Sequence, residues 1–484
     1  MNSIVPRHIG TLLRILRQAG HKGYIVGGAV RDLLLGLTPK DYDIATDALI
    51  DDVNRTMIGA GLTVIEGLGR NYGVAVVVID GQPVEIATFR GERYGQDSHR
   101  PEEVWFETDL YTDLSRRDFT INAMALNDEG NLTDPFDGQA DLAAGFIRTV
   151  GEPGLRFAED GLRMFRACRF AAQLGFRVDP LILAAIPSNL YRVAGLSVER
   201  VRNEIEKTLM AKAPALGLEH MIRSGLLATD CRSRVDHQER SVAILPELTH
   251  LVELRQNRQY HRYDAWRHSL VAVKHTPPAL TLRWAALLHD VGKGMPEVRG
   301  YNREGAPTDF GHDRVGSEIA GGILKRLGVR GTVAKRVKWI VSRHMRFGFH
   351  MGHATAVLNR WIRDEARSGL FHSTGELQAA FQDLVQVCIA DITALISTSE
   401  DLAACRTYGE TLIRLAGSMP VHTSDLDISG RAVLPFLTDK KQIGLFMKVA
   451  LRRTQDGNLT NERDALKAAA IHWNERHSAS PVAP

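Results

Sequence analysis

Strand-forming patterns are confined to the first part of this 484-residue chain, and that division most constrains its fold. Up to about residue 140, short β-rich runs alternate with helical ones. From about Leu155 onward, amphipathic helical patterns predominate, with apolar residues every three or four positions. A chain of this length exceeds one compact domain. We therefore expect an α+β domain followed by all-α domains.

The strand signals in the first part are specific enough to place. Strands are predicted at residues 24–26, 42–45, 73–79 and 84–89, and a helix at residues 30–35. The last two strands are joined by Asp80-Gly81, a dipeptide that favours the tight turn of a β-hairpin. These elements predict a mixed or antiparallel sheet.

Composition excludes several classes of protein. A hydrophobic fraction of 44% and a charged fraction of 24% are typical of globular proteins that form real cores. Neither a signal peptide nor a membrane-spanning stretch is predicted, so no membrane partner is expected. The cysteines are scattered, which argues against disulfides or a thiolate zinc site and favours the reducing cytoplasm: Cys168, Cys231, Cys388 and Cys405.

A glycine pair and two nearby carboxylates suggest chemistry on phosphates. Gly27-Gly28 falls between a predicted strand and helix, where the backbone can approach a phosphate, and Arg31 can add a charge-assisted contact. Asp41 and Asp43 are two residues apart in a predicted strand, so both face one side and suit Mg²⁺. Either feature alone also occurs as a plain turn or a solvated acidic pair.

The two features together resemble a known family. The run GGAVRDLLLG followed by KDYDIAT is similar to the first motif of class II tRNA nucleotidyltransferases and bacterial poly(A) polymerases, members of the polymerase-β-like superfamily. This resemblance implies that Asp41 and Asp43 bind catalytic magnesium ions. It also implies that Gly28 and Arg31 bind the incoming nucleotide.

Other motifs in the first part agree with this resemblance. Residues 116–123 read RRDFTINA and residues 134–138 read DPFDG, as in the family's next two motifs. Arg117 is implied to contact the triphosphate or ribose. Glu85 stands where the superfamily often has a third catalytic carboxylate, although an ordinary exposed strand glutamate is an equal interpretation.

A charged stripe follows in the helical part. Residues 159–170 are predicted to form one helix, on which Asp160, Arg163, Arg166 and Arg169 recur every three residues. Alone, the stripe is typical of a solvated helix surface. The pattern EDxxRxxRxxRF, however, resembles the family's nucleotide-recognition motif. There, Asp160 and Arg163 are implied to bind the base edge of CTP or ATP, and Arg166 and Arg169 a phosphate or ribose.

Two further segments are implied to serve the same site. Residues 197–201, with Glu204 and Lys207, resemble a supporting helix of the family. A loop from Gly91 to Pro101 is expected to move as specificity switches from C to A.

The C-terminal half carries a second candidate metal site. Residues 287–294, LLHDVGKG, resemble the core of the HD phosphohydrolase superfamily. His289 and Asp290 are adjacent at a predicted helix end and can both reach one metal, with His268 as the first ligand. Imidazole and carboxylate ligands suit Mn²⁺, Ni²⁺ or Fe²⁺, and Mg²⁺ stays possible. Further implied ligands are His312, His344 and Asp391.

Taken together, the resemblance implies an α+β polymerase-β-like nucleotidyltransferase head followed by an all-α neck and an all-α HD domain. We expect the head at residues 1–140, the neck at 141–245, the HD domain at 246–400, and a helical region with a disordered tail at 401–484. The implied activity is Mg²⁺-dependent addition of CCA to tRNA from CTP and ATP, by in-line attack that releases pyrophosphate.

Several alternatives stay open. Enzymes that add only CC or only A share all these motifs. A bacterial poly(A) polymerase is less favoured, because residues 67–73, GLGRNYG, depart from the Arg-rich run of those enzymes. An alternative of another class is an HD metallophosphohydrolase whose head serves only to bind RNA, and the intact Asp41 and Asp43 argue against it. The oligomeric state is open.

Overall fold

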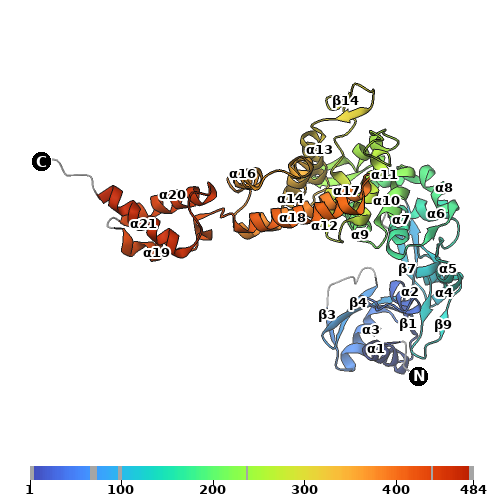
Figure 1. Cartoon of the computed structure of the whole chain (residues 1–484). Coiled ribbons are helices and arrows are strands. Elements are labelled where there is room, and N and C mark those ends of the chain that lie inside the picture. Colours follow the sequence, from blue (N-terminus) through green and yellow to red (C-terminus); the bar gives the residue numbers. More distant parts are fainter. Residues whose placement is uncertain (1–4, 66–72, 96–100, 236–237, 438–439, 479–484) are drawn as a thin grey trace. The chain divides into compact units, whose positions relative to one another are not determined.

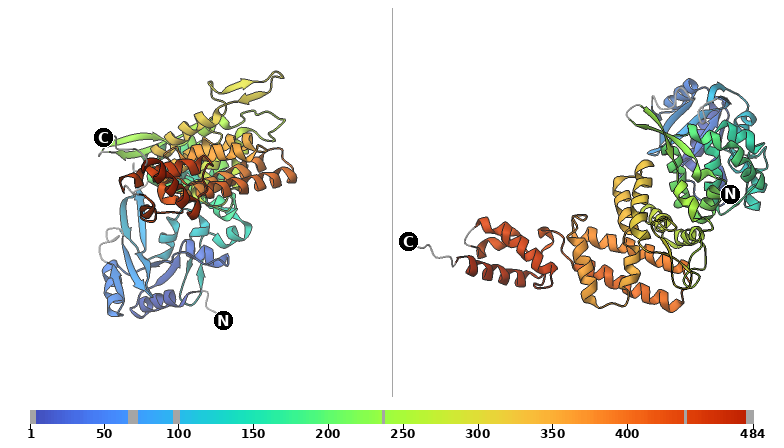
Figure 2. Two further views of the ribbon diagram at one scale, coloured as in Figure 1. Left: turned by 60° about the vertical axis from the view of Figure 1, so that its left-hand side comes forward. Right: turned by 90° about the horizontal axis from the view of Figure 1, so that it is seen from above.

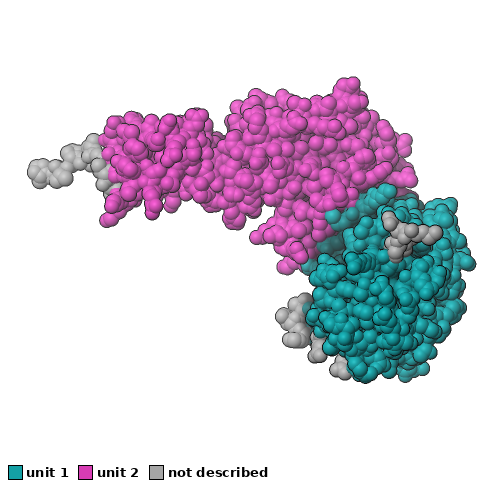
Figure 3. All heavy atoms as spheres, turned by 90° about the horizontal axis from the view of Figure 1, so that it is seen from below, with its two compact units in different colours: residues 1–250, 326–328 teal, residues 251–325, 329–484 magenta. Residues whose placement is uncertain are grey.

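The computed structural model describes residues 5–65, 73–95, 101–235, 238–437 and 440–478. They divide into two compact units (Figure 3): unit 1 at residues 1–250 with 326–328, and unit 2 at residues 251–325 with 329–484. Three sequence-based expectations fall largely outside the described residues. They concern residues 67–73, the middle of the loop at 91–101, and the tail after residue 477.

Unit 1 begins with a mixed sheet, as predicted. Strands β2 and β5 pair in parallel, and the other neighbours in the sheet pair antiparallel. The strand order is β3 (Thr63–Ile65), β4 (Val74–Ile79), β5 (Gln82–Thr88), β2 (Asp43–Thr46), β1 (Gly23–Val26), β8 (Ala125–Leu126) and β9 (Leu132–Thr133).

The apolar pattern of these elements explains how the sheet is covered. Helix α1 (Arg7–Gln18) buries Ile9, Leu12, Leu13 and Leu16, which recur at helical spacing on one face. It packs with α3 (Ile50–Gly59) beside the sheet (Figure 1). A buried core is formed by Val26, Ala45, Phe89, Leu114 and Ala125.

Most predicted elements of the head are confirmed. The hairpin β4–β5 turns at Asp80-Gly81, whose φ angles of 51° and 74° are those that Asp-Gly turns adopt. Helix α2 (Gly28–Leu34) begins at Gly28, two residues earlier than predicted, because Gly27 turns the chain directly out of β1. Asp41 precedes β2 and does not lie within it, since β1 ends at Val26 and leaves residues before Asp43 without a ladder partner.

The rest of unit 1 is mainly helical, with strands that the sequence did not predict. The helices are α4 (Leu110–Ser115), α5 (Gly138–Ala144), α6 (Pro153–Glu159), α7 (Leu162–Leu174), α8 (Pro180–Asn189), α9 (Val198–Leu209) and α10 (Pro214–Arg223). The additional strands are β6 (Arg90–Tyr94), β7 (Pro101–Phe106), β10 (Phe146–Ile147), β11 (Arg177–Val178), β12 (Asp230–Val235) and β13 (Gln238–Ala243). The predicted loop at 91–101 therefore begins as strand β6, which pairs with β7.

The single helix predicted at residues 159–170 is wrong. Helix α6 ends at Glu159 and α7 begins at Leu162, with Asp160 in an extended conformation between them. The carboxylate of Asp160 accepts a hydrogen bond from the backbone N–H of Leu162 at 2.9 Å. Aspartate competes in this way with the helical backbone and starts a new helix.

Unit 2 is an array of helices around α17, which packs against α11, α12, α14, α15 and α18. Helices α17 and α18 run side by side (Figures 1 and 2). The helices are α11 (Ala265–His275), α12 (Leu280–Leu288), α13 (His312–Arg326), α14 (Gly331–Val341), α15 (His344–His350), α16 (Thr355–Ala366), α17 (Thr374–Ala394), α18 (Ser399–Ser418), α19 (Gly430–Val433), α20 (Ile443–Gln455) and α21 (Arg463–Ser478).

Two details of unit 2 complete the fold. A hairpin that was not predicted, β14 (Arg299–Tyr301) with β15 (Pro307–Asp309), lies between α12 and α13. Helices α19, α20 and α21 share a cluster of buried apolar residues that includes Val433, Phe446 and Leu466. Within the described parts of the chain, no helix combines the length and apolarity needed to cross a membrane.

Candidate functional site

The chain turns sharply where strand β1 meets helix α2. Gly27 has a φ of 72°, a conformation that favours glycine, and a Cβ atom there would lie 3.1 Å from Nη1 of Arg117. Arg31, one turn into the helix, donates a hydrogen bond from Nη1 to Oδ1 of Asn122 at 2.9 Å. The glycine pair is therefore bordered by two guanidinium groups, an arrangement that suits a phosphate ligand.

The predicted catalytic carboxylates lie on neighbouring strands. The parallel register of β2 and β5 places Cα of Asp43 opposite Cα of Glu85. Burial, followed by the negative charges of Glu85 and Asp41, raises the pKa of Asp43 to about 6, against the opposing effect of Arg117. The negative charges near Asp43 thus outweigh the positive charge of Arg117. A bound divalent cation fits this donor set, because oxygen ligands of this kind bind Mg²⁺.

Asp41 and Asp43 line a cleft of about 830 Å³ in unit 1. Of the described residues on its wall, eight are arginines and five carry carboxylates. An excess of arginine suits a polyanion such as a triphosphate. The predicted residues on the wall are Gly28, Arg31, Asp41, Asp43, Arg117, Asp160, Arg163, Arg166 and Arg169, while Glu85 is in register with Asp43 on the adjacent strand.

Asp160 and Arg163 lie in the same cleft and are both buried. Burial raises the pKa of Asp160 to about 6, although the N–H of Leu162 and the charges of Arg163 and Arg166 oppose the shift. Nη2 of Arg163 donates to the carbonyl oxygen of Arg116 at 2.9 Å. A carboxylate and a guanidinium are thus held side by side, which provides an acceptor and donors to one ligand.

The two remaining predicted arginines have strong partners in the protein. Arg166 donates from Nε to Oδ2 of Asp118 at 2.6 Å. Arg169 donates from Nε to Oε2 of Glu204 at 2.5 Å, and both of these side chains are buried. The supporting helix predicted at Glu204 therefore contacts the stripe through an ion pair between α9 and α7.

The sequence reasoning missed three cleft residues on strand β6. Arg90, Glu92 and Tyr94 alternate along the strand and all line the cleft. The carboxylate of Glu92 accepts hydrogen bonds from Nε of Arg90 at 2.8 Å and from the hydroxyl of Tyr94 at 2.6 Å. The sequence does carry a signal for this strand, since Arg90, Glu92 and Tyr94 recur with the period of two of a strand. The prediction of a loop from residue 91 is therefore wrong for residues 91–94.

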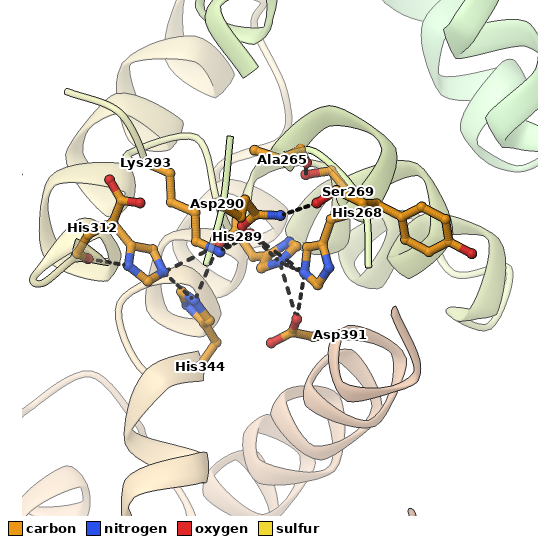
Figure 4. A network of polar contacts seen from close by, with 12 residues as sticks. Ala265, His268, Ser269, His289, Asp290, Lys293, His312, His344 and Asp391 are labelled. Atoms are coloured by element: carbon orange, nitrogen blue, oxygen red, sulfur yellow. Dashed lines mark hydrogen bonds and ion pairs between the residues drawn. The ribbon is translucent and has the colours of Figure 1, made fainter. Parts of the chain in front are cut away.

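Unit 2 contains a second cluster, formed by the predicted HD residues (Figure 4). Nε2 of His268 lies 2.8 Å from Oδ1 of Asp391, which comes from α17. Nε2 of His289 lies 3.3 Å from Nε2 of His268 and 3.3 Å from Oδ2 of Asp290. Four ligand groups thus converge: His268 from α11, Asp391 from α17, and the neighbours His289 and Asp290 from the C-terminal end of α12.

Two more histidines meet Asp290 through its other oxygen. Nε2 of His312 lies 3.2 Å from Oδ1 of Asp290 and 3.1 Å from Nε2 of His344. Asp290 therefore belongs to two candidate metal groups, one with His268 and His289 and one with His312 and His344. Such a shared carboxylate can bridge two ions.

Backbone contacts fix the orientation of three of these rings. The Nδ1 atoms of His289, His312 and His344 each lie 2.7 to 2.8 Å from the carbonyl oxygen three residues earlier in the chain. A carbonyl can only accept, so Nδ1 carries a hydrogen, and Nε2 is the atom through which each ring could bind a metal. Metal-binding histidines are oriented by such contacts.

The charges of the cluster also fit a metal. Burial raises the pKa of Asp290, but the positive charges of His289 and Lys293 outweigh it and hold that pKa well below its ordinary value. Burial, followed by His312 and His289, lowers the pKa of His344 to about 3, so this ring is neutral. A neutral imidazole beside ionised carboxylates is the donor set of a divalent transition metal.

A cavity of about 760 Å³ adjoins this cluster. Its wall includes His261, whose ring centre lies 5.2 Å from that of His268, and Gln256, which accepts a hydrogen bond from Nζ of Lys293 at 2.7 Å. The wall also carries three arginines and three carboxylates, which offer both donors and acceptors to a ligand.

Family models match three parts of the chain. Residues 23–148 match the poly A polymerase head domain, and residues 261–392 match the HD domain. Between them, residues 175–229 match the probable RNA and SrmB-binding site of polymerase A.

Curated relatives match a little under half of the chain. The CCA-adding enzyme of Geobacillus sp. (strain WCH70) is 45% identical over 215 residues, which are 44% of this chain and 52% of the relative. The CCA-adding enzyme of Bacillus subtilis (strain 168) is 44% identical over 215 residues, 44% of this chain and 53% of the relative. The chain thus spans about half the length of the curated relatives it matches.

Solved structures match over nearly the whole chain. The crystal structure of the Bacillus stearothermophilus CCA-adding enzyme in complex with CTP matches with a TM-score of 0.63 and 26% identity, covering 99% of this chain and 100% of that one. The Thermotoga maritima CCA-adding enzyme complexed with tRNA shares the fold, with a TM-score of 0.53, 18% identity, and 97% of each chain covered. The predicted fold class is confirmed. Segments similar to the poly A polymerase head domain, to the probable RNA and SrmB-binding site of polymerase A and to the HD domain thus follow one another along the chain, and its fold is that of the solved CCA-adding enzyme with CTP.

Proposed function

We propose that this protein adds CCA to the 3′ end of tRNA from CTP and ATP, without a nucleic-acid template. The observation that carries the proposal is a single arginine-rich cleft that contains both the carboxylates Asp41 and Asp43 and the pair Asp160 and Arg163. The relatives named CCA-adding enzyme support the choice of substrate.

Asp41, Asp43 and Glu85 would hold magnesium ions. The pKa of Asp43 is raised by burial first and then by repulsion from Glu85 and Asp41, and a bound cation would relieve that repulsion. When bound, the ions lower the pKa of the RNA 3′-hydroxyl and neutralise charge on the phosphates.

The arginine wall would bind the triphosphate. Gly28, Arg31 and Arg117 lie at the sharp turn after β1, where a phosphate can approach the backbone. Arg166 and Arg169 would contact phosphate or ribose, each oriented by its acidic partner.

Asp160 and Arg163 would select the base by its hydrogen-bonding pattern. Cytosine and adenine each present an exocyclic amino donor beside a ring-nitrogen acceptor on the Watson–Crick edge. The carboxylate of Asp160 can accept from the amino group, and the guanidinium of Arg163 can donate to the ring nitrogen. Uracil and guanine place a carbonyl and an N–H at these two positions, so the same pair rejects them. Protein groups thus take the place of a template.

The reaction balances without a covalent enzyme intermediate. The 3′-oxygen of the RNA forms a bond to the α-phosphorus of the nucleotide. The bond from that phosphorus to the β-bridging oxygen breaks, and pyrophosphate leaves. The hydroxyl proton passes to solvent. The arginine wall stabilises the charge that develops on the pyrophosphate.

We infer a division of labour along the chain. Residues 1–140 would carry catalysis, 141–245 base recognition and RNA binding, 246–400 the HD site, and 401–484 a helical C-terminal region. Buried cysteines and the tRNA substrate support a cytoplasmic location.

The test is extension of defined tRNA ends. Purified protein and Mg²⁺ would be incubated with transcripts that lack CCA, end in CC, or end in CCA, with CTP and ATP supplied separately and together. Products are resolved at single-nucleotide length. We expect C, C and A in that order, followed by a stop.

Other outcomes separate the alternatives. Addition limited to CC or to A would indicate an enzyme of split activity, and a long A ladder would indicate a poly(A) polymerase. The absence of any extension would refute nucleotidyl transfer.

The buried cluster of unit 2 favours a second activity, hydrolysis of phosphate esters by a metal-dependent HD site. Two groups of three ligands share Asp290, and the arginine-lined cavity adjoins them. The test is hydrolysis of a generic phosphodiester with Mn²⁺, Ni²⁺ or Mg²⁺. We expect activity that Asp290→Asn abolishes without loss of tRNA extension, and no metal-dependent hydrolysis would contradict this second candidate.

A further inference from the structure

One buried arginine outside the wall of the cleft ties two of its parts together. Arg192 comes from the short 3₁₀ helix Leu190–Gly195 and is 8% exposed. Its Nη2 donates hydrogen bonds to the carbonyl oxygen of Gly95 at 3.2 Å and to that of Glu159 at 3.3 Å. Gly95 directly follows strand β6, and Glu159 directly precedes Asp160. The two hydrogens of one nitrogen therefore bridge a cleft strand and the base-recognition segment.

The backbone of Arg192 makes a second contact with the same segment. A Cβ atom on Gly161 would lie 3.0 Å from Cβ of Arg192 and 3.1 Å from its carbonyl carbon and oxygen. Gly161 has a φ of −61°, which every residue can adopt, so glycine is required here for space and not for conformation. Asp160 is thus flanked on both sides by residues that contact Arg192.

Strand β6 also contacts the other base-recognition residue. The ring of Tyr94, the neighbour of Gly95, lies 5.7 Å from Cζ of Arg163. The hydroxyl of Tyr94 is held by Glu92, which also pairs with Arg116 at 2.9 Å. A displacement at the end of β6 would therefore shift Arg163, while the bridge of Arg192 connects that same end to Asp160.

We propose that Arg192 is a positioning residue for base selection. It keeps Asp160 and Arg163 at a fixed separation by joining the end of strand β6 to the junction of α6 and α7. The inference rests on the proposed function. Discrimination between C and U requires an acceptor and a donor at fixed separation, and small displacements allow the opposite pattern to bind. Arg192 touches no substrate in this scheme and acts on the site through the backbone carbonyls of Gly95 and Glu159.

The experiment compares CTP with UTP on a tRNA transcript that lacks CCA. For Arg192→Ala, we expect the ratio of kcat/KM for CTP to that for UTP to fall on the order of tenfold, because both hydrogen bonds of the bridge are lost. A rise in KM for CTP should carry most of the loss. Arg192→Lys should restore part of the ratio, because an ammonium group can still donate to both carbonyls. The matched control is Arg223→Ala, which removes an exposed arginine paired with Glu219 on α10.

A second variant tests the same contact from the other side. Gly161→Ala leaves every polar group in place and should lower the CTP preference by separating Arg192 from the junction. Binding of CTP and UTP to each variant would be measured by calorimetry in parallel. The ratio of the two dissociation constants reports base selection even if the protein transfers no nucleotide. If Arg192→Ala does not fold, Arg192→Lys and Gly161→Ala decide the question.

An unchanged CTP to UTP ratio in the folded variants, with kcat lowered equally for both nucleotides, would overturn the inference. That result differs from failure of the proposed function, in which the unaltered protein would extend no tRNA.

Discussion

Burial raises the pKa values of two carboxylates of the cleft, but the charges around them differ. The pKa of Asp43 is raised to about 6 by burial together with its acidic neighbours Glu85 and Asp41. The pKa of Asp160 is raised to about 6 mainly by burial, with arginines that oppose the shift. A bound cation should lower the pKa of Asp43 again. A base that donates a hydrogen bond should lower that of Asp160. The two residues therefore respond differently to substitution.

Asp160→Asn is expected to stabilise unit 1 at neutral pH. The folded-state pKa of about 6 exceeds the ordinary value of 3.8, so the contribution of Asp160 to stability is complete below pH 3.8 and is lost as pH rises through 6. Asparagine stays neutral and can still accept from the N–H of Leu162. We expect a gain of about 2–3 kcal/mol at pH 8 and almost none at pH 4, measured by urea unfolding.

The same substitution should abolish preference for CTP over UTP, because the acceptor then lacks its charge and gains donors. Asp52→Asn, on the surface of α3 and paired with Arg55, serves as the control and should change neither property. An equal stability difference at pH 4 and pH 8 would show that the ionisation of Asp160 is not the cause.

Asp41→Asn and Asp43→Asn should each lower the rate of nucleotide addition by about a thousandfold, since each removes a ligand of the catalytic cations, whose charge stabilisation amounts to several kcal/mol. Single-turnover extension of tRNA measures the effect. Asp43→Asn should leave the protein at least as stable as before, because it removes repulsion with Glu85. Activity close to that of the unaltered chain would place the catalytic carboxylates elsewhere.

At the scale of elements, the strands and turns of the head could be predicted because local sequence determines them. Asp80-Gly81 has few other conformations available between two β-rich runs, and Gly27 occupies a φ that other residues resist. The break at Asp160 could not be predicted from periodicity, because the arginine spacing continues across it. The helix ends where Asp160 is extended and its carboxylate accepts a hydrogen bond from the N–H of Leu162.

The candidate sites were predictable to different degrees. The adjacency of His289 and Asp290 is local, whereas Asp391 meets His268 across 123 residues and could be proposed only from the family resemblance. Strand β6 was missed because its residues are polar and face a cleft, so no apolar alternation marks it. Arg192 carries no motif, and its role depends on two backbone carbonyls that only the fold brings together.

The ion pair of Arg169 with Glu204 joins helices α7 and α9. Both side chains are buried, so Glu204→Ala would leave a guanidinium without its partner in a site that excludes water. We expect a loss of about 3–5 kcal/mol in the unfolding free energy of unit 1, measured with urea. Asn203→Ala, exposed on the same helix, should stay within about 0.5 kcal/mol of the original protein. A loss below about 1 kcal/mol would mean that Arg169 finds another partner.

At the scale of the whole molecule, each compact unit contains its own candidate site. The cleft residues all belong to unit 1, and the clustered histidines and carboxylates all belong to unit 2. Each unit also has a core of its own. A ligand that binds one site should therefore stabilise that unit directly, by an amount set by its concentration relative to its dissociation constant.

Metal ions should act on the two units selectively. At a concentration one hundred times its dissociation constant, Mn²⁺ or Ni²⁺ should stabilise unit 2 by about 2.7 kcal/mol and raise its thermal unfolding transition, while CTP with Mg²⁺ should raise that of unit 1. Calorimetry of the full chain measures both transitions, and chelation should reverse the first shift.

Asp290→Asn should weaken the response of unit 2 most, because Asp290 contributes to both ligand groups. His472→Ala removes an exposed histidine outside the cluster and should leave the response intact. If transition metals leave the unfolding temperature of unit 2 unchanged while tRNA extension is intact, the buried histidines and carboxylates serve only to hold the helices together.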